Sequence, residues 1–216
     1  MKKKLLGIAL CALLSLPLAA RESDSGLGFS LGARFSVLGL EPTVSLLFNH
    51  LEVEASAPLQ SKHVYETKYD TDGTTVLGQE LKGYTFGFAP EVSIGYNSKP
   101  FTSGWQNGFG FTALWVTDNY LNAFMGTSDS SGISSFLDSN GKVDFTQGAY
   151  LGSLYYRGAI QWKGGFSLYF RITVPLAAYV PSMGDAGFYS IMEPEFATAA
   201  VSAAFLGTAV GIRFTF

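Results

Sequence analysis

The sequence contains few charged residues for its length. Asp, Glu, Lys and Arg make up only 14% of the 216 residues, whereas about 25% is usual for a soluble domain. Aromatic residues reach 15%, and there are 25 glycines. Such a composition is unusual for a protein that faces water on all sides. We therefore expect much of the surface to contact an apolar medium.

The sequence also lacks a long apolar run after residue 20. Gly, Ser, Pro or a charged residue interrupts every apolar stretch before it reaches the roughly 20 residues that a membrane-spanning helix needs. In lipid, the other structure that satisfies all backbone hydrogen bonds is a closed barrel of strands. These two observations predict an all-β fold, a closed antiparallel transmembrane β-barrel.

The first 20 residues have the pattern of a signal peptide. Three lysines precede an apolar run at 5–16, and Ala19 and Ala20 suit a signal peptidase. We predict a signal peptide over 1–20 and an outer-membrane barrel over 21–216. Cys11, the only cysteine, lies in the leader, so no disulfide is expected in the mature chain. Without the three leader lysines, 11 basic residues face 17 acidic ones, and this net charge of −6 argues against a nucleic-acid partner.

Alternation of apolar and polar residues is the main evidence for strands. Every second residue from Leu27 to Val37 is apolar, and Arg34 lies among the polar residues between them. The same period of two recurs at 84–96 and 166–176. An apolar outer face and a polar inner face are typical of transmembrane barrel strands. We predict eight strands, at 26–37, 42–48, 51–57, 81–97, 106–117, 148–161, 166–180 and 197–216.

The connection at Asn49 and His50 decides the strand count. The apolar phase shifts there, which either a tight turn or a β-bulge can produce. The bulge would merge two strands and let 60–83 form a hairpin, and we keep ten strands as the alternative count. We favour the turn, because short connections at 49–50, 97–105 and 162–165 then lie on the periplasmic side. The long connections at 60–80, 118–147 and 181–196 lie on the outer side, as in outer-membrane barrels.

The alternation points seven charged residues into the barrel lumen. About eight strands leave an interior just wide enough for side chains to fill. Buried charges are expensive unless they are paired, and four cations against three anions suit pairing. We therefore favour a closed ion-pair network that plugs the lumen. The lumen-lining charges are Arg34, Glu52, Glu54, Glu91, Arg157, Arg171 and Arg213.

The alternative for the lumen is a narrow polar pore. Rings of charged side chains line the pores of larger channels. Small inward residues would leave space for such a pore, and the alternation places five glycines on the inner face. These are Gly28, Gly32, Gly87, Gly95 and Gly110.

Aromatic residues gather near the predicted strand ends, where a ring can lie among lipid headgroups. We predict an inner girdle that contains Trp105, Trp162 and Phe166, and an outer girdle that contains Tyr84 and Trp115. Two such girdles would mark the upper and lower limits of the membrane on the barrel.

The last predicted strand carries Val210, Ile212, Phe214 and a terminal Phe216 on one face. This pattern resembles the assembly signal that the barrel-assembly machinery recognises in Gram-negative outer-membrane proteins. In length and strand number the chain is similar to the small eight-stranded group that includes the OmpA membrane domain, OmpX, OmpW and PagL, and no motif selects one of them. The resemblance implies the bacterial outer membrane as the location, with its lipid and the assembly machinery as partners.

Residues suited to catalysis or metal binding are scarce. Only His50 and His63 could act as an imidazole base, and neither is followed two residues later by the serine of a PagL-like site, since Glu52 and Tyr65 stand there. The segment 69–74 resembles part of a calcium loop but lacks its distal Glu. We therefore expect no enzyme, no catalytic or metal-ligating residues and no cofactor.

Three functions are consistent with these expectations. The first is a structural or surface-exposed outer-membrane barrel that lets small solutes pass. The second is a narrow porin-like channel or an OmpW-like transporter, although charged lumen residues fit poorly with the apolar lumen of OmpW-like proteins. The third is an adhesin that binds an extracellular ligand through its outer loops, chiefly 118–147, because long loops on a rigid scaffold often carry function.

Overall fold

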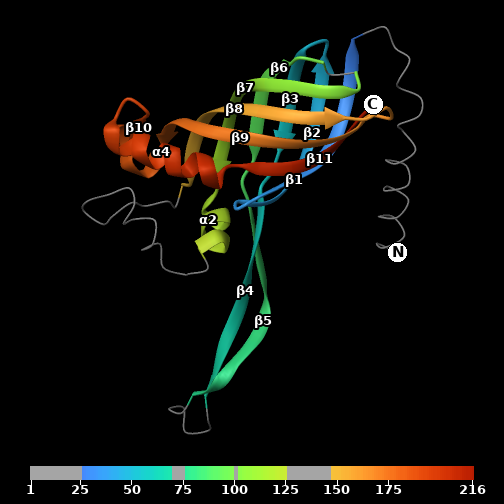
Figure 1. Ribbon diagram of the computed structural model, residues 1–216. Helices are drawn as coiled ribbons and strands as arrows, with labels where there is room; N and C mark the ends of the chain where they lie inside the picture. Colours follow the sequence, from blue (N-terminus) through green and yellow to red (C-terminus); the bar gives the residue numbers. More distant parts are fainter. Residues whose placement is uncertain (1–25, 70–75, 100–101, 126–146) are drawn as a thin grey trace.

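A computed structural model describes residues 26–69, 76–99, 102–125 and 147–216. Eight antiparallel strands close into a barrel (Figure 1), because the last strand pairs with both the first strand and its own predecessor in the wall. The prediction of an all-β fold with a closed antiparallel barrel is confirmed, with eight strands rather than ten in the barrel. In order around the wall they are β1 (Leu27–Ser36), β2 (Gly39–Phe48), β3 (Leu51–Ser56), β6 (Glu91–Asn97), β7 (Gly104–Val116), β8 (Ala149–Gln161), β9 (Phe166–Tyr179) and β11 (Ala209–Thr215).

The connection between β2 and β3 is the predicted tight turn. The strands pair up to Phe48 and Leu51, and only Asn49 and His50 lie between them. Asn49 has a φ of 54°, in the left-handed region that asparagine tolerates better than most residues. Its N–H donates to the carbonyl of Gly26 at 2.5 Å. We call this end of the barrel, which also holds the connection 162–165, the turn end.

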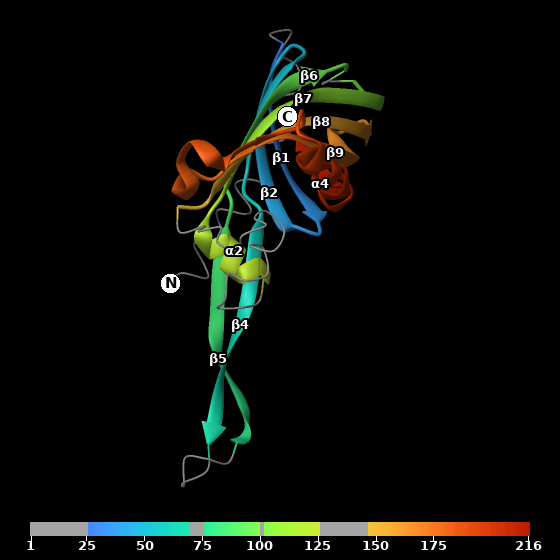
Figure 2. The same ribbon diagram turned by 90° about the vertical axis from the view of Figure 1, so that its left-hand side faces the viewer.

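A two-stranded arm projects from the opposite end, here called the arm end (Figures 1 and 2). It consists of β4 (Leu59–Tyr69) and β5 (Val76–Phe88), which pair with each other along their length. The predicted long connection at 60–80 lies at the end opposite the tight turn, but its described residues form strands rather than a loop. The predicted strand 81–97 is interrupted at Ala89 and Pro90. Pro58 and Pro90 stand at the two junctions, where a residue without an N–H interrupts the ladder and lets the chain leave the wall.

Four short elements lie in the other arm-end connections. They are α2 (Asp118–Met125), η2 (Pro181–Gly187), β10 (Phe188–Ser190) and α4 (Pro194–Leu206). The predicted strand 197–216 is wrong in its first half, which belongs to α4. Alanine-rich sequence favours a helix, and Pro194 stands at its first position, where proline is tolerated. Neither helix in the described ranges is long and apolar enough to cross a membrane.

Some predictions fall on residues that the structure does not describe. These are the signal peptide at 1–20, the calcium-like segment from Asp70 to Gly73 and most of the loop 118–147, apart from its beginning in α2. They stay predictions.

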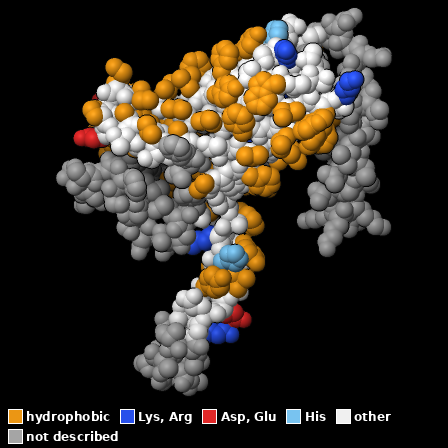
Figure 3. Space-filling model, in the orientation of Figure 1, with side chains coloured by type: hydrophobic (Ala, Val, Ile, Leu, Met, Phe, Trp, Pro, Cys, Tyr) orange, Lys and Arg blue, Asp and Glu red, His pale blue; other side chains and the backbone are white. Residues whose placement is uncertain are grey.

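The burial of side chains in the barrel is the reverse of that in a soluble protein. Along β2, Glu41, Thr43 and Ser45 are buried while Leu46 and Phe48 are exposed. The same alternation runs through β7 and β11. Hydrophobic side chains consequently cover the visible face of the barrel wall in Figure 3. The polar and charged side chains are therefore collected in the interior, where the candidate site lies.

Candidate functional site: the charged interior of the barrel

Arg34 is the centre of a charge layer near the arm end. Its Nε donates to the carboxylate of Glu41, and its Nη1 lies 2.8 Å from Glu54 Oε1. Its Nη2 lies 2.5 Å from Glu91 Oε1. Arg171 reaches the same two oxygens, at 2.9 Å from Glu54 Oε1 and 3.0 Å from Glu91 Oε1. We call this group of two guanidinium groups and three carboxylates the Arg34 layer.

Glu52 is the centre of a second layer nearer the turn end. Both of its oxygens accept hydrogen bonds from Arg157, and Oε1 also accepts from Arg213 Nη1 at 2.9 Å. The side-chain amide of Asn97 donates to Glu52 at 3.3 Å. Arg157 Nη1 lies 3.7 Å from the second oxygen of Glu54, which connects this Glu52 layer to the Arg34 layer. Glu52 and Arg213 are each only 1% exposed.

The structure places all seven predicted lumen charges inside the barrel, together with one that the sequence analysis missed. The eighth is Glu41, which makes the interior balanced at four guanidinium groups and four carboxylates. Sequence reasoning began the second strand at Pro42 and so stopped one residue short. Extending the inward positions Thr43 and Ser45 by one step would have included it.

The inward glycines accommodate bulky groups rather than a channel. A Cβ on Gly95 would lie 2.3 Å from the hydroxyl of Tyr155, and one on Gly108 would lie 3.3 Å from Arg157 Nη2. A Cβ on Gly87 would lie 2.4 Å from the backbone of α2. At Gly95 and Gly87, two positions to which the pore hypothesis assigned space, a phenol and a helix fill that space. At Gly108, a further inward glycine, a guanidinium group fills it.

Both ends of the interior carry further side chains. At the turn end, the amide of Gln106 donates to Gln161 Oε1 at 2.7 Å, and both residues are buried. At the arm end, Ala89, Leu114 and Tyr120 form a buried apolar cluster. Between these ends lie the two charge layers, so a solute in the lumen would have to displace paired side chains.

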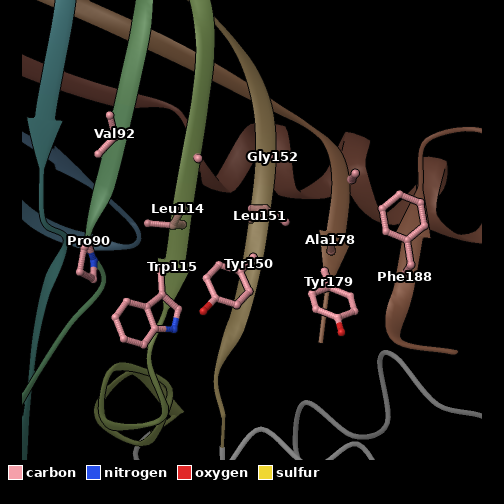
Figure 4. Close-up of a pocket in the computed structure, with 12 residues that line it drawn as sticks. Pro90, Val92, Leu114, Trp115, Tyr150, Leu151, Gly152, Ala178, Tyr179 and Phe188 are labelled. Carbon is pink, nitrogen blue, oxygen red and sulfur yellow. The ribbon is translucent and has the colours of Figure 1, made fainter. Parts of the chain in front are cut away.

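The outward face carries a shallow apolar groove at the arm end (Figure 4). Trp115, Tyr150 and Tyr179 stand opposite one another on β7, β8 and β9. The next outward row consists of the small residues Ala113, Gly152 and Ala177, which leaves a groove of about 390 Å³ beside the aromatic rings.

The predicted girdle residues lie on the outward face, with one exception. Trp115 is in the arm-end aromatic row, with its ring 6.1 Å from that of Tyr150. At the turn end, the rings of Trp162 and Phe166 are 5.3 Å apart, and Trp105 is half exposed. Tyr84 lies on β5 of the arm instead, with its ring 4.9 Å from His63.

The residues of the predicted assembly signal form the outward face of β11. Val210, Ile212 and Phe214 are exposed there. Phe216 follows the strand, and its N–H donates to the carbonyl of Phe29 at 2.8 Å. The structure therefore gives these side chains one common surface, and their recognition by an assembly machinery stays a prediction.

Neither histidine takes part in the ion pairs of the charge layers. His50 is in the turn between β2 and β3, where its Nδ1 lies 2.8 Å from the carbonyl oxygen of Asn97. His63 was expected in a loop and lies instead in β4 of the arm. Within the described ranges, no group of three or more His, Cys, Asp or Glu residues could hold a metal ion.

No family model, no curated protein and no solved structure matches this chain. The chemistry of the barrel wall and of its interior is therefore what a functional proposal has to explain.

Proposed function

We propose that this protein is an integral outer-membrane β-barrel, structural or surface-exposed, whose lumen is closed by buried ion pairs. One observation carries the proposal: charged side chains fill the interior while large apolar side chains face outward. Phe109 and Phe111, for example, are 58% and 61% exposed on the wall. Soluble monomers rarely expose large continuous apolar surfaces, whereas an outward apolar band is what outer-membrane barrels present to lipid.

The closed backbone supports the same proposal. β1 pairs with β2 on one side and with β11 on the other, so the barrel wall has no free edge there. In hydrocarbon an unpaired edge would leave backbone polar groups without partners, at several kcal/mol each. The predicted signal peptide adds export to this argument, since outer-membrane proteins must leave the cytoplasm.

The interior favours a closed barrel over an open channel. Four guanidinium groups and four carboxylates are mutually paired and buried across the lumen. Removing one partner from a buried pair is costly, because the other charge is left alone. A porin-like or OmpW-like transporter would need a free path, and ion pairs block such a path here.

The three tryptophans offer a direct test of the lipid-facing wall. Trp105, Trp115 and Trp162 are the only tryptophans of the chain, and all three are exposed on the outward face. In vesicles whose acyl chains carry bromine, tryptophan fluorescence should be strongly quenched, while aqueous iodide should quench it little. Strong quenching by iodide and none by the brominated lipid would contradict the proposal. Fractionation of cells should place the protein with the outer membrane.

A bilayer recording separates the closed barrel from a channel. The protein reconstituted in a planar bilayer should show no conductance steps, because the ion-pair layers block the lumen. Reproducible steps that change with Arg171→Ala would favour the channel instead. Arg213→Ala tests the Glu52 layer in the same way.

The arm supports a second candidate function, ligand binding at the cell surface. Tyr65, Tyr84 and Phe86 are 56%, 56% and 72% exposed on a ribbon that extends beyond the barrel (Figures 1 and 3). Exposed aromatic groups in a protruding segment are typical of contact surfaces. Cells that carry Phe86→Ser and Tyr84→Ser should bind candidate host or environmental ligands less well than cells with the unaltered protein. Equal binding would argue against this function.

A further inference from the structure

The first turn of α2 lies directly on the arm-end mouth of the barrel. The hydroxyl of Thr117 accepts the N–H of Tyr120 at 3.2 Å, as a residue that caps a helix does. The same hydroxyl donates to the carbonyl of Phe88 at 2.6 Å. The backbone of Asn119 lies so close to Gly87 that a Cβ there would be 2.4 Å from it. Two contacts with β5 therefore hold the helix start in place.

Tyr120 extends from this helix across the mouth. Its side chain is 4% exposed and packs with Ala89 and Leu114 above the Arg34 layer. Its hydroxyl donates to the carbonyl of Leu38 at 2.5 Å. Leu38 lies in the turn between β1 and β2, so the hydrogen bond joins α2 to a different part of the barrel rim. Tyr120 thus connects two segments 82 residues apart in the chain.

The hydroxyl of Tyr120 can donate its hydrogen bond over the whole physiological pH range. Burial raises the pKa of Tyr120 well above its usual range, and the nearby charge of Glu41 raises it further. The hydroxyl therefore keeps its proton at any physiological pH. The contact with Leu38 does not depend on titration.

We propose that Tyr120 is the latch of an apolar seal over the arm-end mouth, and that its hydrogen bond to Leu38 holds this seal closed. The seal consists of α2 residues 118–121 with Ala89 and Leu114. When the latch is released, water and small hydrophilic molecules reach the Arg34 layer from the arm end. The Glu52 layer stays closed to these molecules, because the ion pairs of the Arg34 layer lie between it and the arm-end mouth. This inference deepens the proposed closed lumen and rests on it.

A single introduced cysteine can report on the seal. Ser56 is partly buried beside the Arg34 layer, and its hydroxyl accepts a hydrogen bond from Arg34 Nη2 at 3.0 Å. Cys11 is the only cysteine in the sequence and lies in the predicted leader, so Ser56→Cys would supply the only thiol of the mature chain. The rate at which a small charged methanethiosulfonate labels this thiol would be measured on the purified folded protein in detergent. With Tyr120 present, labelling should be slow.

Two variants test the latch. Tyr120→Phe removes only the hydroxyl and should speed labelling about fivefold, the factor that one net hydrogen bond typically contributes. Tyr120→Ala also removes the ring and should speed labelling further. Should Tyr120→Ala fail to fold, Tyr120→Phe still tests whether the hydrogen bond to Leu38 holds the seal closed. Tyr150→Phe is the matched control, since Tyr150 is exposed on the outside of the wall at the same end, and it should leave the rate unchanged.

A second reporter distinguishes opening of the seal from loss of the whole fold. Ser30 is buried on β1, four residues nearer the turn end than Arg34, and its hydroxyl lies 2.5 Å from that of Ser45. Ser30→Cys should stay slowly labelled in both Tyr120 variants. Fast labelling of both reporters, fast labelling of Ser56→Cys with Tyr120 intact, or no change on Tyr120→Phe would each overturn the latch. All these rates are independent of membrane location, which tryptophan quenching tests separately.

Discussion

The barrel and the β4–β5 arm consist of similar alternating strands, but only the barrel has an interior. In the barrel, Glu52 and its arginine partners are almost completely buried. In the arm, Lys68 and Glu80 also form an ion pair, at 2.6 Å, and their side chains are 58% and 63% exposed. The comparison shows that closure of the wall, rather than alternation alone, brings charged side chains together in a buried network.

The two regions also differ in what covers their apolar faces. The apolar face of the barrel forms one continuous wall around a filled interior, which suits lipid. The arm exposes both faces of a two-stranded ribbon, and an isolated ribbon of this kind is marginally stable in water. The arm is held at its base by the N–H of Ala89, which donates to the carbonyl of Pro58 at 3.0 Å, and by α2.

The largest effect is expected when the buried network loses a carboxylate. Glu52→Gln removes the carboxylate partner of Arg213, leaves Arg157 only the more distant carboxylate of Glu54 at 3.7 Å, and should lower the free energy of unfolding by about 3–5 kcal/mol. Denaturant unfolding of the folded protein in vesicles measures this change. If Glu52→Gln lowered the free energy of unfolding by less than about 0.5 kcal/mol, as expected for an exposed ion pair, the barrel interior would be hydrated and its charges screened by solvent.

An outward charge should distinguish the wall from the arm. Ile94 is exposed at the middle of β6, and Ile94→Arg should cost about 2–4 kcal/mol if this position faces the membrane midplane. Phe86→Arg on the arm should change stability by no more than about 0.5 kcal/mol, as is usual for surface substitutions. Equal effects in vesicle unfolding would remove the distinction between the two surfaces.

Shortening the arm should leave the barrel intact. Replacing residues 64–83 with Asn-Gly keeps His63 and Tyr84 as the closing pair of a short hairpin. Because loop-closure entropy changes only slowly with length, the free energy of unfolding should change by no more than about 1–2 kcal/mol. Thermal unfolding followed by circular dichroism measures it. Loss of the barrel signal would mean that the arm is required for folding.

The smallest effect is expected at the exposed ion pair of the arm. Lys68→Ala should change the free energy of unfolding by less than about 0.5 kcal/mol, because solvent screens the pair with Glu80. Raising the salt concentration should remove even that difference. A loss comparable to that of Glu52→Gln would indicate that a partner buries this part of the arm.

Much of the barrel was predictable because its strands are regular. The period of two located β1, β7, β8 and β9, and it indicated the inward arginines on β1, β8 and β9. These predictions used residues that are neighbours in the chain or two positions apart. The turn at Asn49 and His50 was chosen over a β-bulge because it places the short connections on one side of the barrel and the long ones on the other.

Two segments could not be assigned by the same reasoning. The arm was predicted as a loop, since residues such as Lys62 and Lys68 interrupt its apolar alternation. In α4, the apolar composition was taken for a strand, although alanine favours a helix and the period of two is absent. Glu41 was missed because the beginning of β2 was placed too late.

The sequence by itself determined which side chains face inward and which face outward, because a strand alternates its two faces whatever it pairs with. Only the tertiary structure decided that the inward charges are closed into two paired layers and that Tyr120 reaches Leu38 across the mouth. Both outcomes join residues far apart in the chain. The distances between these residues follow from the register of eight strands around a closed wall. Alternation along one strand carries no information about that register.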